Sequence, residues 1–177
     1  MRSPGKVLLT QNRNLGVQKS LLEFDAMKNK VLFICVHNSA QPDGGSVAQL
    51  YLRRLFEAQS AGLEPGTINP LVVQAMKEVG IDLSQKQTQA VFDVWKSSQL
   101  FQYVITVCSE SEAKGCPVFA GVTTRLHWPF RDPSQLTGSN EEKLREVRKI
   151  RDEIRCQIEE WCEEICPQAL AANAALE

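Results

Sequence analysis

The chain has 177 residues and 43% hydrophobic content, enough for one domain with a complete core. Its 20 basic and 21 acidic residues give a formal net charge of −1, so the composition favours neither a nucleic-acid nor a membrane-surface partner. No apolar run has the length needed to span a bilayer, and the early run Val7-Leu8-Leu9 is too short for a signal-peptide core. We therefore expect a cytoplasmic protein.

Cysteine is the residue type that most needs an explanation. In a reducing compartment, structural disulfides are not expected. No two cysteines have the Cys-x-x-Cys spacing, and the two histidines stand far apart, so we expect no metal site. The six cysteines are Cys35, Cys108, Cys116, Cys156, Cys162 and Cys166.

The two ends of the chain differ from its middle. Residues 1–26 are polar and weakly patterned, and we expect them to form an N-terminal extension outside the core. The domain itself is expected over residues 27–166. Residues 167–177 form a low-complexity tail, and its final Leu176-Glu177 has the form of a cloning remnant.

Strands and helices alternate within the domain. Helix starts are marked by Ser46 with Gln49, by Asn69 before Pro70, and by Ser139 with Glu142, while Gly80 marks a helix end. In chain order, the expected elements are a strand at 31–36, a helix from 46 to about 58, a short strand near 58–61, helices at 71–79 and 91–98, strands at 103–107 and 123–128, and a helix from 139 to about 162. This alternation predicts a single α/β domain with a parallel sheet and helices on both faces.

Three reactive side chains directly follow predicted strands. They are Cys35, Cys108 and Asp132, and in a parallel sheet the carboxyl ends of the strands lie at one edge, where ligands bind. The polar loop after Cys35 leads into the helix that starts at Ser46. A helix N-terminus favours negative charge, and both a thiolate and a bound oxyanion gain from that field. The sequence therefore predicts an active site at this edge.

The motifs, taken together, resemble a known family. They are Val31 to Ala40, Ser60-Ala61-Gly62, Asn69-Pro70, Ala75-Met76, Gly80 to Ser84, Val107-Cys108-Ser109, Cys116-Pro117, His127 to Phe130, and Asp132-Pro133. Over about residues 28–162 the chain resembles the low-molecular-weight tyrosine phosphatase fold, in its thioredoxin-coupled arsenate reductase branch. The resemblance implies a four-stranded parallel sheet.

The same resemblance implies a reaction and the residues that perform it. Cys35 matches a nucleophilic thiolate, Cys108 and Cys116 match the two cysteines of a disulfide relay, and Asp132 matches a general acid. The implied reaction reduces arsenate to arsenite. Thioredoxin would be the electron donor, an oxyanion (arsenate or a phosphate ester) the substrate, and no bound cofactor or metal is implied.

The anion loop departs from the family pattern. That pattern places an arginine six residues after the nucleophile, where its fork holds two oxygens of the oxyanion. Gln41 occupies the place here, and aligning backwards from Ala48 instead sets Gly44-Gly45 where an Arg-Ser pair is expected; neither alignment supplies an arginine. Arg131, beside Asp132, is the nearby arginine that could compensate for the missing one. The expected loop residues are Val36, His37, Asn38, Ser39, Ala40, Gln41, Gly44, Gly45 and Ser46.

Three functions remain open from the sequence. The first is a working arsenate reductase, and the second is an impaired relative that serves as a binding or thiol-redox module because its loop lacks the arginine. The third is a phosphotyrosine phosphatase, which needs Cys35 and Asp132 but neither relay cysteine. After Asp132-Pro133 the chain continues as Ser134-Gln135-Leu136, which offers no aromatic wall for a phenol ring.

Overall fold

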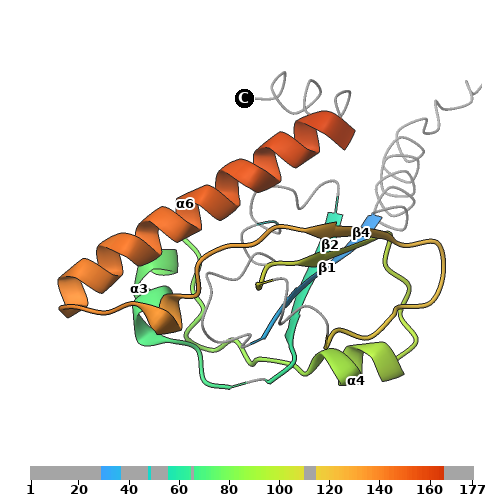
Figure 1. Cartoon of the computed structure of the whole chain (residues 1–177), viewed down its shortest axis with the longest axis horizontal. Coiled ribbons are helices and arrows are strands. Elements are labelled where there is room, and N and C mark those ends of the chain that lie inside the picture. The colour runs from blue at the N-terminus through green and yellow to red at the C-terminus, as the bar shows by residue number, and fades with distance from the viewer. Residues whose placement is uncertain (1–28, 37–47, 49–55, 65, 110–114, 166–177) are drawn as a thin grey trace, which may run out of the picture.

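A four-stranded sheet organises the structure. The computed structural model describes residues 29–36, 48, 56–64, 66–109 and 115–165 (Figure 1). The strands are β1 (Asn29–Cys35), β2 (Phe56–Gly62), β3 (Tyr103–Thr106) and β4 (Thr124–His127). Their order is β2-β1-β3-β4, and every neighbouring pair is parallel. The predicted α/β fold with a four-stranded parallel sheet is confirmed.

Helices cover both faces of this sheet, as predicted (Figure 1). The described helices are α3 (Pro70–Lys77), α4 (Val91–Lys96), the short 3₁₀ helix η1 (Pro133–Gln135) and α6 (Asn140–Ile165). Side chains alternate along a strand, so Val31, Phe33 and Cys35 of β1 pack with α3 and α6. Leu32 and Ile34 point the other way and pack with α4. We call these the α3/α6 face and the α4 face.

The predicted helix signals act as expected. The Asn69 side chain accepts a hydrogen bond from the Leu71 amide at 3.0 Å, which caps α3 ahead of Pro70. At the start of α6, the Ser139 amide donates to the Glu142 carboxylate at 2.8 Å, and the Glu142 amide donates back to the Ser139 hydroxyl at 3.3 Å. Gly80 follows α3 with φ +82°, a conformation that glycine adopts without strain.

One predicted boundary is wrong. The helix expected from Ser46 to about Ala58 cannot extend that far, because Phe56, Glu57 and Ala58 belong to β2. Phe56 and Ala58 are buried while Glu57 is exposed, which is the alternation of a strand. Pairing with β1 from the Asn29–Phe56 register onwards overrides the helical pattern of the preceding residues. Among residues 46–55, only Ala48 is described, and it is helical and buried.

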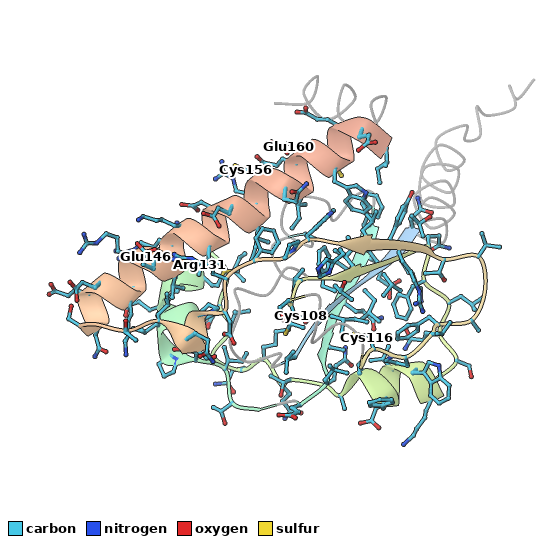
Figure 2. All side chains as sticks on the ribbon, viewed as in Figure 1. Cys108, Cys116, Arg131, Glu146, Cys156 and Glu160 are labelled. Carbon is cyan, nitrogen blue, oxygen red and sulfur yellow. The ribbon has the colours of Figure 1, made fainter. Side chains whose placement is uncertain are left out.

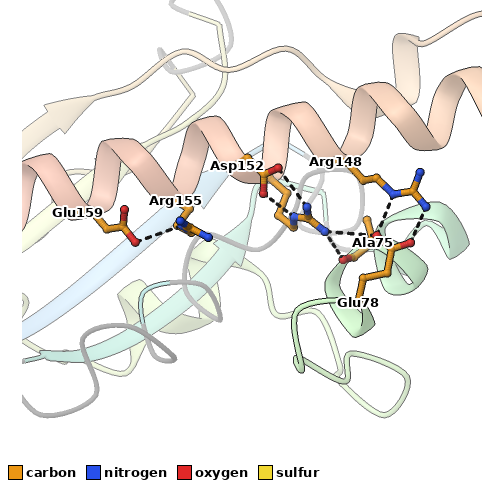
Figure 3. Close-up of polar contacts among 7 residues, drawn as sticks. Ala75, Glu78, Arg148, Asp152, Arg155 and Glu159 are labelled. Atoms are coloured by element: carbon orange, nitrogen blue, oxygen red, sulfur yellow. Dashed lines mark hydrogen bonds and ion pairs between the residues drawn. The ribbon is translucent and has the colours of Figure 1, made fainter. Parts of the chain in front are cut away.

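Helix α6 is tied to α3 by charged side chains (Figure 3). Arg148 forms two hydrogen bonds with the Glu78 carboxylate, at 2.8 and 2.7 Å. The buried Arg151 donates to the Ala75 carbonyl at 2.7 Å and also to Asp152 on its own helix. The Arg148 hydrogen bonds lower the pKa of the Glu78 carboxyl, so this pair is charged at neutral pH. In the part of the chain that is described, no helix is both long enough and apolar enough to cross a membrane.

Candidate functional site

Cys35 is the last residue of β1 and lies at the carboxyl edge of the sheet. It is 7% exposed and belongs to the core on the α3/α6 face. The chain that leaves β2 runs beside it, because the Leu63 amide donates to the Cys35 carbonyl at 3.1 Å and the Glu64 amide to the Val36 carbonyl at 2.8 Å. Of the predicted anion-loop residues, Val36 is described; His37 to Ser46 lie outside the described residues.

Cys108 leaves the neighbouring strand at the same edge. It comes two residues after the end of β3, and Ile34 of β1 is paired with Thr106 of β3. The Val107 amide extends this pairing by donating to the Ile34 carbonyl at 2.9 Å. Cys108 itself is buried, with 4% exposure. The structure thus sets Cys35 and Cys108 at adjacent strand ends, as the sequence predicts.

Asp132 is brought to this edge by the chain that leaves β4. The Trp128 amide donates to the Thr106 carbonyl at 2.8 Å and the Phe130 amide to the Val107 carbonyl at 3.2 Å, so this segment follows the exit of β3. Asp132 then caps η1, and its carboxylate accepts hydrogen bonds from the amide and the hydroxyl of Ser134 at 2.8 and 2.7 Å. Asp132 is half-buried, and these two hydrogen bonds fix the orientation of its carboxylate.

Cys116 approaches from the opposite face of the sheet. It is half-buried and packs against the core cluster of the α4 face, whereas Cys35 belongs to the cluster of the α3/α6 face. The pKa of the Cys116 thiol is raised to about 11, chiefly by burial and also by the nearby Cys108, while Arg125 partly offsets both effects. Cys116 therefore interacts electrostatically with Cys108 and is a neutral thiol at pH 7. Figure 2 shows Cys108 and Cys116 in the same region, with Cys116 close to α4.

The described cysteines and carboxylates define what this edge can do. Cys35 and Cys108 lie at the ends of adjacent strands, and Cys116 lies in the same region as Cys108. Exchange between thiols and disulfides is chemistry that such a group of cysteines can support. A half-buried carboxylate at the same edge, that of Asp132, can move a proton. Among the described residues, no group of three histidine, cysteine, aspartate or glutamate side chains could hold a metal ion.

Arg131 faces away from this chemistry. Its guanidinium forms an ion pair with Glu146 of α6, and Figure 2 shows the two side chains next to each other at that helix. Lys149 binds the same carboxylate at 2.6 Å. These two cations lower the pKa of the Glu146 carboxyl, with the Lys149 hydrogen bond the larger cause. Arg131 is therefore engaged with α6 and not with the strand ends.

Two cavities lie near the site, and the sequence did not single out the charged residues that line them. One, of about 320 Å³, has Cys116, Arg125 and His127 in its wall. The other, of about 430 Å³, lies between the segment after β2 and the segment before α4 and is lined in part by Lys86. Burial lowers the pKa of the Lys86 ammonium to about 8. Arg125 and His127 are two residues apart in the predicted strand at 123–128. Residues with this spacing lie on one face of a strand, and this was the signal in the sequence that could have placed them together.

A known family matches most of the chain. The matching family is described as low molecular weight phosphotyrosine protein phosphatase, and the match covers residues 30–173. The chain belongs to this family. Within the family its curated relatives include an arsenate reductase from Bacillus subtilis strain 168, which is 36% identical over 140 residues, covering 77% of this chain and 98% of that relative. The chain thus lies in the arsenate reductase branch.

Solved structures show the same fold. An arsenate reductase in an oxidised state has a TM-score of 0.62 at 21% sequence identity, with 75% of this chain and 95% of that chain covered. A thioredoxin-dependent arsenate reductase from Corynebacterium glutamicum has a TM-score of 0.51 at 25% identity, with 81% of this chain and 72% of that chain covered. These likenesses confirm the phosphatase-like fold.

Proposed function

We propose that this protein is an arsenate reductase that uses Cys35 as nucleophile, Cys108 and Cys116 as a disulfide relay, Asp132 as general acid and thioredoxin as electron donor. The placement of Cys35 and Cys108 at the ends of paired strands, with Cys116 in the same region as Cys108, is the observation that supports it most. A phosphatase reaction has no use for a second and third cysteine so placed.

The first half of the reaction takes place on Cys35 and Cys108. The Cys35 thiolate attacks arsenic(V), and a hydroxide leaves with a proton from Asp132. The Cys108 thiolate then attacks the Cys35 sulfur, the electron pair of the arsenic–sulfur bond passes to arsenic, and arsenite departs. The two electrons come from the two thiols, which become a disulfide.

The second half carries the oxidation across the sheet. Cys116 attacks the Cys108 sulfur, Cys35 is released as a thiolate, and a Cys108–Cys116 disulfide forms on the α4 face. A thioredoxin dithiol then reduces that disulfide. Once Cys108 is part of a disulfide it carries no negative charge, so one of the two causes that raise the Cys116 pKa disappears at the step where Cys116 must attack.

The loop without its arginine is expected to limit the rate. Loss of one preorganised donor to a developing oxyanion costs about 10²–10³ in rate. Two variants test this point and also separate the two alignments of the loop. If Gln41 stands in the arginine position, Gln41→Arg should raise the rate; if Gly44 does, Gly44→Arg should. No gain from either substitution would mean that the loop does not hold the oxyanion as the family pattern does.

The activity itself is tested with arsenate, thioredoxin, thioredoxin reductase and NADPH. We expect arsenate-dependent NADPH oxidation that is lost in Cys35→Ser, Cys108→Ser and Cys116→Ser variants. Cys156→Ser is the matched control, because Cys156 is exposed on α6 and should leave the rate unchanged. Absence of arsenate-dependent oxidation, next to an active relative in the same assay, would contradict the proposal.

A phosphatase is the second candidate, favoured by the family to which the chain belongs. It requires Cys35 and Asp132 and is indifferent to the relay. Turnover of p-nitrophenyl phosphate that is lost in Cys35→Ser but kept in Cys108→Ser and Cys116→Ser would favour it. If neither substrate is turned over, protection of Cys35 from alkylation by phosphate or arsenate would identify an impaired protein that still binds oxyanions.

A further inference from the structure

The cavity next to Cys116 is lined by several polar side chains. Its volume is about 320 Å³, and its polar lining consists of Thr106, Cys116, Arg125 and His127, next to the apolar side chain of Val104. A pocket of this size with a few convergent polar groups is typical of small-molecule binding sites. It lies on the α4 face, so it is separate from the core that surrounds Cys35.

Strand pairing explains why these side chains converge. In the β3–β4 register, Val104 is paired with Arg125 and Thr106 with His127. Residues two apart on a strand share a face, so Arg125 and His127 point to the side where Val104 packs, the α4 face. Strand β4 is at the edge of the sheet, which leaves the cavity open to solvent.

The charge in this cavity is positive. The Arg125 guanidinium donates to the Pro117 carbonyl at 3.4 Å, which holds it over the segment that carries Cys116, and it lowers the pKa of that thiol. The His127 Nδ1 and the Thr106 hydroxyl share a hydrogen bond of 2.8 Å, so the imidazole is also oriented. No carboxylate is found in the described lining. An anionic molecule is therefore favoured over a neutral or cationic one.

We propose that this cavity recognises anionic low-molecular-weight disulfides of the glutathione disulfide class and that Cys116 forms a mixed disulfide with them. The Cys116 thiolate attacks one sulfur of the disulfide, and the sulfur–sulfur bond breaks. The other half leaves as a thiolate and takes up the proton that Cys116 has lost. Arg125 pairs with a carboxylate of the half that stays bound.

The chemistry of Cys116 makes such an adduct slow to form and persistent. A thiol that is almost fully protonated at neutral pH attacks slowly. A thiolate of high pKa is also a poor leaving group. A thiol that later attacks the small-molecule sulfur of the mixed disulfide therefore releases Cys116 slowly. As far as the proposed arsenate reaction holds, an adduct at Cys116 stops the relay after the Cys35–Cys108 disulfide, which would make the cavity a control point.

The test compares three symmetric disulfides on the reduced full-length protein. Glutathione disulfide is anionic, 2-hydroxyethyl disulfide is neutral, and cystamine is cationic. Peptide mass spectrometry gives the modification rate of each cysteine, and the exposed Cys156 serves as the internal reference. We expect the rate ratio of anionic to neutral reagent to be about tenfold higher at Cys116 than at Cys156, the gain of one charge-assisted contact. Cystamine should show the opposite preference.

Matched variants assign the preference to the cavity. Arg125→Gln should reduce the ratio at Cys116 to that at Cys156, while Arg145→Gln, an exposed arginine on α6, should leave it unchanged. Circular dichroism and the midpoint of thermal unfolding check that each variant is folded. Equal ratios at the two cysteines in the unaltered protein, or a preference that survives Arg125→Gln, would overturn the proposal.

The same measurement keeps this proposal apart from the proposed arsenate reaction. Modification of Cys116 needs no arsenate and no Cys35, so it should persist in the Cys35→Ser variant. If arsenate reduction is absent and the anion preference is present, only the proposed reductase function fails. If the preference is absent and arsenate is reduced, only the cavity proposal fails.

Discussion

The hydrophobic cores on the two faces of the sheet differ in size and in how closely their aromatic side chains pack. On the α3/α6 face, Trp161 packs against Phe56, Tyr103 and Trp128, with ring centroids 5.1, 4.9 and 5.6 Å apart. On the α4 face the core is smaller, and α4 leaves Trp95 46% exposed. The buried cysteine that ends β1 belongs to the first face, and the half-buried Cys116 belongs to the second. The proposed nucleophile is thus buried in the larger core, and the proposed exchange thiol is half-buried at the smaller one.

A pair of tryptophan substitutions should show this difference most strongly. Trp161→Ala removes a side chain that is 5% exposed and packed in an aromatic cluster, and we expect it to lower the free energy of unfolding by about 3–5 kcal/mol. Trp95→Ala, on the half-exposed α4, should cost about 1 kcal/mol, chiefly the hydrogen bond from its indole to the Val118 carbonyl. Urea denaturation measures both. Similar losses would mean that the two faces are equally important to stability.

Two arginines on α6 sharpen the comparison within one helix. Arg151 is 9% exposed and donates to the Ala75 carbonyl, so Arg151→Ala should lower the free energy of unfolding by about 2–3 kcal/mol. Arg155 forms an ion pair with Glu159 at 3.1 Å, with both side chains more than 40% exposed (Figure 3). Arg155→Ala is the control and should cost about 0.5 kcal/mol or less. A loss at Arg155 as large as that at Arg151 would contradict this assignment.

The pH dependence of the Cys116 reaction rate tests the electrostatics of the α4 face. Only the thiolate is alkylated, and burial raises the pKa of this thiol to about 11. Its rate of reaction with iodoacetamide should therefore rise about tenfold per pH unit from pH 7 to about 10, equivalent to about 1.4 kcal/mol per unit. Peptide mass spectrometry follows the rate. A plateau near pH 9 would mean that the thiol is not held in its neutral form.

Substitutions of Cys108 and Arg125 should shift the pH profile of Cys116 alkylation in opposite directions. Cys108→Ser removes a negative charge and should shift the profile to lower pH. Arg125→Gln removes the cation that favours the thiolate and should shift it to higher pH. Shifts of the same sign would show that the two side chains act through packing and not through charge.

The smallest effect concerns the start of α4. The residue before this helix, Ala90, makes no side-chain hydrogen bond to it, whereas α3 is capped by Asn69 and α6 by Ser139. Ala90 has φ −77° and ψ 137°, the backbone conformation of a capping residue. Ala90→Ser should therefore raise the free energy of unfolding by about 0.5–1 kcal/mol. Ser139→Ala, with a loss of about 1 kcal/mol, is the matched opposite; a loss on Ala90→Ser would show that the hydroxyl cannot reach an amide of α4.

Local signals predicted most of the fold. The alternating apolar strands and the caps at Asn69 and Ser139 were enough to place β1, α3 and α6 to within a few residues. The helix predicted from Ser46 to about Ala58 ran into β2 because no glycine or proline marks a helix end before Gly62, and the pairing of Phe56 with Asn29 decides for the strand. Pairing between distant segments is not a local property, so a window of sequence does not contain it.

The sequence predicted which edge of the sheet carries the candidate site. It did not predict which face of the sheet each cysteine packs on. Parallel strands bring Cys35, Cys108 and Asp132 to one edge, and the sequence alone supports that inference. That Cys116 packs on the α4 face depends on how the chain returns after β3, and no local pattern specifies that path. The sequence did not single out Arg125, and it gave His127 only as part of a family motif, because a cavity is formed by the packing of several segments. The roles of these residues stay predictions.

The short edge strand β4 also affects how the protein behaves at high concentration. An exposed strand edge can pair with another molecule, and short length, charged side chains and nearby proline all oppose that pairing. Strand β4 has four residues, bears Arg125, and is followed closely by Pro129. We therefore expect Arg125 to oppose such pairing in addition to its proposed role in the cavity. Its replacement by glutamine should make the protein associate more readily on concentration, so the comparison of disulfide reagents calls for dilute protein and a light-scattering check.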